Sequence, residues 1–181
     1  MSARALLRSG TAEEHQRVDA LFTRFDLGDI FDYRRFIRGQ AAAFLPLEAR
    51  LDAAGASAIV PDWDERRRSH LIRQDLAALG EPIPVPPADL PPMSEAAQLG
   101  AIYVLEGSRL GGKYLLRAVP EAFPRRFLSS RQAPGAWRKL LELIDDKLYG
   151  SEDQYAALAA ARDAFALFER AGAVELETSR A

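Results

Sequence analysis

The clearest chemical pair in the sequence is His15 and Asp19, which lie four residues apart. In a helix this spacing places two side chains on one face, one turn apart. The carboxylate of Asp19 could accept the Nδ1 proton of His15 and leave Nε2 free to bind a metal ion. Leu7, Val18 and Phe22 follow the same helical repeat, so the imidazole is expected on or beside the buried side of its helix. The alternative is a histidine beside the core whose ion pair only stabilises the helix.

Three glycines, Gly107, Gly111 and Gly112, interrupt a strongly helical segment. Each costs on the order of 1 kcal/mol relative to alanine inside a helix, so a compensating contact is expected. Gly107 and Gly111 share one helix face, which would admit a flat ligand against the backbone or permit a kink that closes over a ligand. Close packing against another helix uses the same spacing and remains the alternative. The segment also matches the G-x-x-x-x-G-K skeleton of a phosphate-binding loop, but Tyr114 stands where that motif needs Ser or Thr.

Several basic side chains could hold an anionic group at the mouth of a pocket beside His15. Arg8 precedes this histidine by two helical turns, and Arg138 and Lys139 begin a later helix. Most other basic residues, and the second histidine, are expected to be solvated surface: Arg66–Arg68, Arg125–Arg126 and His70.

Composition excludes several functions. The chain has 181 residues with 24 basic and 26 acidic side chains, a balance that argues against binding nucleic acid or an anionic membrane. It has no cysteine and two histidines, which excludes thiol, disulfide and iron–sulfur chemistry and nearly excludes a multi-histidine metal site. No apolar run approaches the ~20 residues that span a bilayer, and the first residues do not resemble a secretory signal, so a cytoplasmic protein is expected.

Composition also predicts an all-α fold. Helix-forming Ala (32) and Leu (24) far outnumber β-branched Val (6), Ile (7) and Thr (3). We expect one domain over residues 1–181, with Pro46 kinking a helix, residues 80–92 extended and residues from about 174 frayed. The predicted helices run from about Ala3 to Phe25, Asp32 to Leu51, Asp62 or Asp64 to Leu79, Ser94 to Val119, Pro134 or Gly135 to Tyr149, and Ser151 to Gly172.

Two segments together resemble the haem oxygenase family, in its bacterial, biliverdin-producing, phytochrome-associated branch. Thr11–Asp19 resembles the family's proximal helix, in which a histidine is the axial haem ligand and an acidic residue one turn later orients it. Tyr103–Gly112 resembles the distal helix, whose glycines let the backbone lie over the haem face and leave room for oxygen. Many family members carry an aspartate that anchors proton-delivering waters where this chain has Ser108, a difference that would affect turnover more than haem binding.

The resemblance implies a single-domain helical bundle that cleaves haem, both cofactor and substrate, to biliverdin, carbon monoxide and ferrous iron. Dioxygen and an external electron donor, such as ferredoxin or a flavoprotein reductase, would be required, and a phytochrome is an expected recipient of biliverdin. The implied site residues are His15 on iron, Gly107, Ser108 and Gly111 at the reacting face, and Arg8, Asp19, Tyr103, Gly112, Arg138 and Lys139 around the haem.

Three other functions stay open at this point. A haem-binding or haem-sensing protein that does not turn haem over would be compatible with Ser108. A helical enzyme of the wider related fold could act on a small cofactor without iron. A purely structural helical adaptor would leave the glycines of residues 107–112 unexplained.

Overall fold

The computed structural model describes residues 2–85 and 91–177, and within these residues the chain forms helices and no strand. The fold is therefore all-α, as the composition predicts. The elements follow one another as α1 (Ala3–Gly10), α2 (Ala12–Phe22), α3 (Ile30–Ala53), α4 (Ala56–Ile59), α5 (Trp63–Arg66), α6 (Ser69–Leu79), α7 (Glu95–Leu115), the 3-10 helix η1 (Leu116–Ala118), α8 (Arg126–Ser129), α9 (Ala136–Lys147) and α10 (Ser151–Glu177).

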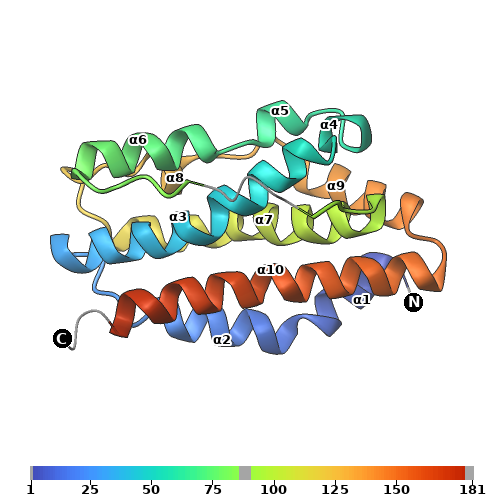
Figure 1. Ribbon diagram of the computed structural model, residues 1–181, viewed down its shortest axis with the longest axis horizontal. Helices are drawn as coiled ribbons and strands as arrows, with labels where there is room; N and C mark the ends of the chain where they lie inside the picture. The colour runs from blue at the N-terminus through green and yellow to red at the C-terminus, as the bar shows by residue number, and fades with distance from the viewer. Residues whose placement is uncertain (1, 86–90, 178–181) are drawn as a thin grey trace.

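The long helix α10 runs along the length of the molecule and organises the bundle (Figure 1). It packs against α7 and α3 on one side and against α1 and α2 on the other. Helix α6 covers the outer side of α3, and α8 lies between α6 and α7. One hydrophobic core connects residues from α1 through α10. Among the described residues, no helix is both long enough and apolar enough to cross a membrane.

Two glycines allow α10 to approach its neighbours closely. A Cβ atom added to Gly100 of α7 would lie 2.0 Å from the carbonyl oxygen of Ala157 in α10. A Cβ added to Gly172 of α10 would lie 2.2 Å from Leu21 Cδ2 and 2.9 Å from Phe22 Cζ, both in α2. Helix α10 therefore contacts both α2 and α7 at points where no larger residue fits without a shift of structure.

The first predicted helix is two helices. Helices α1 and α2 meet at Thr11, whose φ of -117° and ψ of 9° depart from helical values. The Thr11 hydroxyl donates a hydrogen bond to the Leu7 carbonyl at 2.7 Å and is buried there. Thr is β-branched and competes for backbone hydrogen bonds, which is the physical reason for the break at this position.

Another predicted helix is also divided, into α5 and α6. The buried Glu48 of α3 accepts hydrogen bonds from the N–H groups of Arg68 and Ser69, each at 2.8 Å, and so caps α6 from a distant part of the chain. Helix α3 begins earlier than predicted, because Asp29 rather than Asp32 accepts the first N–H groups.

The remaining boundaries agree in part with the predictions. Ser94 caps α7 as expected, and α3 continues through Pro46, with its second half turning away from the first in Figure 1. Helix α10 continues beyond Gly172 to Glu177, so the fraying predicted for residues 174–177 is wrong. Arg38 Nη2 lies 2.6 Å from Glu175 Oε2 and fixes this last part of α10 to α3. The parts of the predicted extended segment that the structure describes are not helical, while residues 86–90 and 178–181 lie outside the description.

Candidate functional site

A cavity of about 1020 Å³ lies between α1 and α2 on one side and α7 on the other. This volume is at the upper end of the range for small-molecule sites, roughly 300–1,000 Å³. Most of its wall is apolar, which suits a flat hydrophobic ligand. The aromatic lining residues are Phe22, Phe36, Phe127, Phe165, Phe168, Tyr103, Tyr114 and Trp137.

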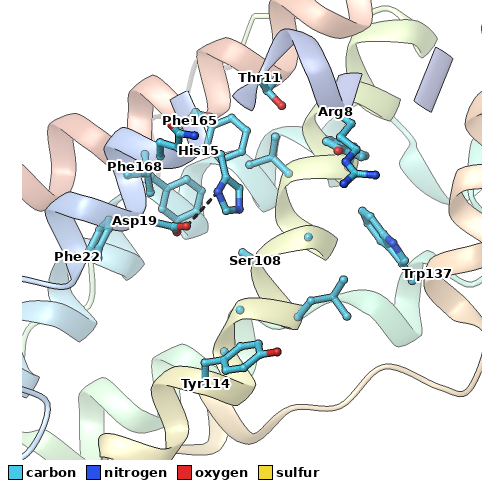
Figure 2. A pocket seen from close by; sticks show the side chains of 18 of the residues that line it. Arg8, Thr11, His15, Asp19, Phe22, Ser108, Tyr114, Trp137, Phe165 and Phe168 are labelled. Atoms are coloured by element: carbon cyan, nitrogen blue, oxygen red, sulfur yellow. Dashed lines mark ion pairs between the residues drawn. The ribbon is translucent and has the colours of Figure 1, made fainter. Parts of the chain in front are cut away.

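His15 projects from α2 into this cavity, toward α7 (Figure 2). Its Nδ1 lies 3.0 Å from Asp19 Oδ2, and its ring meets Phe165 edge to face at 5.8 Å between centroids. Nε2 makes no hydrogen bond within residues 2–85 and 91–177, so it is available to a ligand. The side chain is 61% exposed because it faces the cavity, and its ring contacts the buried Phe165, so it lies beside the buried side of its helix as expected. The contact predicted between His15 and Asp19 is confirmed.

The glycines of α7 form the opposite wall. A Cβ at Gly111 would have no neighbouring atom within 4 Å, and a Cβ at Gly107 would meet only Trp137 Cη2 at 3.8 Å. Close helix packing therefore does not explain these two glycines, and both line the cavity. Gly112 is different: it also lines the cavity, but a Cβ there would lie 3.4 Å from the Leu128 carbonyl oxygen, so this glycine serves the contact of α7 with α8.

Ser108 faces the cavity between these glycines. Its Oγ donates a hydrogen bond to the Leu105 carbonyl at 2.7 Å and accepts one from Arg68 Nη2 at 2.9 Å. Arg68 itself lines the cavity and is only 3% exposed. The prediction that Arg66 and Arg68 are solvated is wrong: Arg66 is also buried, and its Nη1 lies 2.8 Å from Glu106 Oε2 of α7.

Arg8 and two aromatic side chains, Tyr103 and Trp137, lie together at one end of the cavity. Arg8 of α1 lies there beside Trp137 (Figure 2) and makes no ion pair within the described residues. Tyr103 packs against Trp137 at 5.5 Å between ring centroids. Burial raises the pKa of Tyr103, and the positive charge of Arg8 partly opposes that shift. Arg4 lines the cavity as well, but its guanidinium is engaged by Asp145 at 2.8 Å.

Arg138 and Lys139 do not line the cavity. The Arg138 side chain is 77% exposed, with its Nε 3.7 Å from Glu142 Oε1. The residues of α9 that reach the cavity are Trp137 and Leu141, one turn apart, because consecutive helical residues point about 100° apart and the face that bears Arg138 turns away. Of the residues predicted around the ligand, the structure therefore brings together Arg8, His15, Asp19, Tyr103, Gly107, Ser108, Gly111 and Gly112.

The same fold occurs in solved haem oxygenases. The chain aligns with the enzyme from Neisseria meningitidis, solved with bound NO and CO, with a TM-score of 0.80 and 22% identity over 97% of this chain and 92% of that one. The enzyme from Leptospira interrogans gives a TM-score of 0.72 and 20% identity over 95% and 98% of the two chains. At these identities the likeness shows the fold.

Two haem oxygenases are also similar to this chain in sequence. A haem oxygenase of Xanthomonas campestris is 30% identical over 155 residues, covering 81% of this chain and 92% of that protein. Haem oxygenase PigA of Pseudomonas aeruginosa is 30% identical over 171 residues, covering 87% and 85%. No protein-family model matches the chain.

Fold and cavity together define a helical protein with a slot for a flat, largely apolar ligand between an imidazole and a glycine face. Because the chain is 30% identical to two haem oxygenases over most of their length, it belongs to the haem oxygenase family. It is an enzyme that cleaves haem oxidatively, and the non-catalytic alternatives are not favoured.

Proposed function

We propose that haem lies between α2 and α7, with His15 Nε2 on the iron and with Gly107 and Gly111 against the opposite face. One observation carries this proposal: the cavity has an unengaged imidazole nitrogen on one wall and, on the other, two glycines that packing does not explain. Asp19 Oδ2 lies 3.0 Å from His15 Nδ1, a position from which it would hold the Nδ1 proton and so favour the tautomer that presents Nε2 to a metal.

When bound, haem supplies the iron that takes up dioxygen and the porphyrin carbon that is oxidised to give biliverdin and carbon monoxide. The chain's own residues position and shield this chemistry. Gly107 and Gly111 leave space between backbone and ring, since neither places a Cβ there. Phe22, Phe165 and Phe168 give the slot an apolar lining that limits water beside the ring.

Titration with hemin, followed by reduction in air, tests the proposal. We expect one hemin per chain with the spectrum of a histidine-ligated haem, and conversion of its Soret band into the spectrum of biliverdin. A non-catalytic haem-binding protein would form only an oxygen complex or return to the ferric state. Absence of stoichiometric hemin binding would contradict the proposed site.

Asp19→Asn is expected to lower biliverdin formation about tenfold, the lower end of the range for groups that orient a metal-bound histidine. Asparagine keeps the shape of the side chain but removes the charge that holds the Nδ1 proton. The unfolding temperature of the apoprotein should hardly change, because the pair is about two-thirds exposed. Single-turnover spectra and thermal unfolding measure the two effects.

Glu169→Gln is the matched control for this substitution. Glu169 of α10 pairs at 3.2 Å with Arg17 of α2, the helix that also carries Asp19. Glu169 does not line the cavity, so turnover should be unaffected. Equal loss of turnover in both variants would show that Asp19 matters only for the position of α2.

We propose that Arg8 holds a haem propionate, since it is the cation at the cavity mouth without an ion pair among the described residues. Arg8→Met is expected to weaken hemin binding by about two- to fivefold, as for a partly exposed ion pair, and to change the ratio of biliverdin isomers. Arg138→Met is the control and should change neither quantity, because Arg138 lies outside the cavity. Chromatography of the pigment and hemin titration provide the measurements.

Electrons must reach the haem from another molecule under this proposal, and we assign that role to ferredoxin or a flavoprotein reductase. The absence of cysteine supports it, because the chain has no ligand for an iron–sulfur cluster. A phytochrome as recipient of biliverdin rests on the family resemblance and is tested by transfer of pigment to an apo-phytochrome. The single-domain organisation is supported by the one shared core, and a cytoplasmic location is tested by cell fractionation.

A further inference from the structure

Glu106 of α7 is a buried carboxylate that directly precedes Gly107, the first glycine of the cavity wall. Its Oε2 accepts hydrogen bonds from Arg66 Nη1 of α5 and from Gln132 Nε2, each at 2.8 Å. Its Oε1 lies 3.2 Å from Arg109 Nη2, one turn further along α7. Both carboxylate oxygens are therefore engaged, by side chains that are not among the described residues lining the cavity.

Arg66 links this carboxylate to the start of α9. Its Nη2 donates to the Ala136 carbonyl at 3.0 Å, and its Nε and Nη2 donate to the two oxygens of Asp62 at 2.7 and 2.8 Å. Trp137, which directly follows Ala136, lines the cavity and would lie 3.8 Å from a Cβ at Gly107. One guanidinium thus contacts both the carboxylate beside the glycine wall and the backbone beside Trp137.

The glycine wall depends on contacts made outside the slot. Glycines lower the helix propensity of residues 107–112, and neither Gly107 nor Gly111 is held by close packing. Glu106 and Arg109 share a different, buried face of the same stretch, because they lie three residues apart. Buried ion pairs with several hydrogen bonds hold their groups in one geometry. The cluster therefore fixes how α7 is rotated about its axis beside the slot.

We propose that Glu106 and Arg66 are positioning residues, which fix the glycine wall and Trp137 relative to each other and so select the orientation of the haem ring. A flat ring held at its centre by one iron–nitrogen bond can rotate about that bond, so contacts at its face and edge determine which bridging carbon is oxidised. Neither residue lines the cavity, and both act through its walls. The inference rests on the proposed placement of haem between α2 and α7.

Glu106→Gln tests this role in the full-length hemin complex. Glutamine keeps the shape of the side chain and removes the charge that holds Arg66 and Arg109. The ratio of biliverdin isomers should change at least about threefold, within the range for residues that couple distant sites. The hemin Kd should change less than about twofold, because no contact to haem is removed. Chromatography of the pigment and hemin titration measure the two effects.

Glu81→Gln is the matched control. Glu81 is a largely buried carboxylate that also has two arginine partners, Arg38 at 2.9 Å and Arg34 at 3.7 Å, both of α3. It is not among the described residues that line the cavity, so the ratio of isomers should equal that of the wild type. Circular dichroism verifies that each variant is folded at the temperature of the assay, since both lose a charge that pairs with arginine.

Arg66→Lys is the second variant and serves as the test if Glu106→Gln does not fold. Lysine keeps the positive charge beside Glu106 but lacks the planar fork that reaches Asp62 and the Ala136 carbonyl together. It should therefore retain more stability than Glu106→Gln and still change the ratio of isomers.

An unchanged ratio of isomers in folded Glu106→Gln or Arg66→Lys would overturn the inference and leave the cluster with a stabilising role only. An equal change in Glu81→Gln would overturn it as well, because reduced stability alone would then alter the products. So would loss of hemin binding in both cluster variants, which would show that the whole slot had collapsed. Failure of the wild-type protein to bind hemin would contradict the proposed function itself, which is a separate result.

Discussion

His15→Ala is expected to abolish the spectrum of histidine-ligated haem and to lower biliverdin formation by at least about a hundredfold. The substitution removes the one imidazole among the described residues that line the cavity. Loss of a group that merely orients a metal-bound histidine already lowers metal affinity or activity by about 10–100-fold. Hemin titration and anaerobic reduction followed by exposure to air measure both effects. The fold should survive, because the His15 side chain is more than half exposed.

His70→Ala is the matched control, since His70 is the second of the two histidines, is exposed and does not line the cavity. Its hemin spectrum and turnover should equal those of the wild type. Free imidazole should restore the ligated spectrum in His15→Ala, because the substitution leaves space on that wall. Full turnover in His15→Ala would remove this histidine from the proposed mechanism.

Alanine at Gly111 and alanine at Gly100 are expected to change stability in opposite directions, although both glycines lie in α7. A Cβ at Gly100 meets the backbone of Ala157 at 2.0 Å, so Gly100→Ala should cost at least about 3 kcal/mol and lower the unfolding temperature by about 6–12 °C. A Cβ at Gly111 meets nothing, so Gly111→Ala should gain about 1 kcal/mol from helix propensity, or about 2–4 °C. Thermal unfolding of the apoproteins by circular dichroism measures both.

The rate of biliverdin formation is the second measurement for Gly111→Ala. The methyl group of Gly111→Ala enters the space proposed for haem and oxygen, so biliverdin formation should fall by at least about tenfold in a protein that is more stable. Such a trade of stability for activity is characteristic of a functional position. If Gly111→Ala were as active as the wild type, this glycine would have no role at the haem face.

Spacing within a single helix allowed part of the site to be predicted. The interval of four residues predicted the contact of His15 with Asp19 and the common face of Gly107 and Gly111, because helical geometry alone fixes both. The scarcity of β-branched residues predicted the all-α fold, because helix propensity, like helical spacing, is a local property of the sequence.

Features that depend on tertiary contacts were missed or wrong. Arg68 reads as a solvated residue in its run of arginines, and its burial depends on rings from α3 and α8 and on a carbonyl from α7. The sequence predicts Arg138 at the cavity, but its neighbour Trp137 faces the cavity instead. The difference of one residue follows from the rotation of α9 about its axis in the bundle, which local spacing does not determine. The start of α6 could not be predicted locally, because its cap is Glu48, which lies about 20 residues earlier in α3. The break at Thr11 depends on a single hydrogen bond from its hydroxyl to the Leu7 carbonyl.

Two glycines affect the width of the slot proposed for haem. Gly172 of α10 contacts α2, and Gly100 of α7 contacts α10. Phe22, which meets Gly172 at the rear, also forms part of the slot's lining. Because α10 packs against both α2 and α7, its two close contacts at Gly172 and Gly100 set the spacing of the cavity walls, although neither glycine lines the cavity. Substitutions on α10 are therefore expected to alter the width of the slot proposed for haem while leaving His15 and Asp19 unchanged.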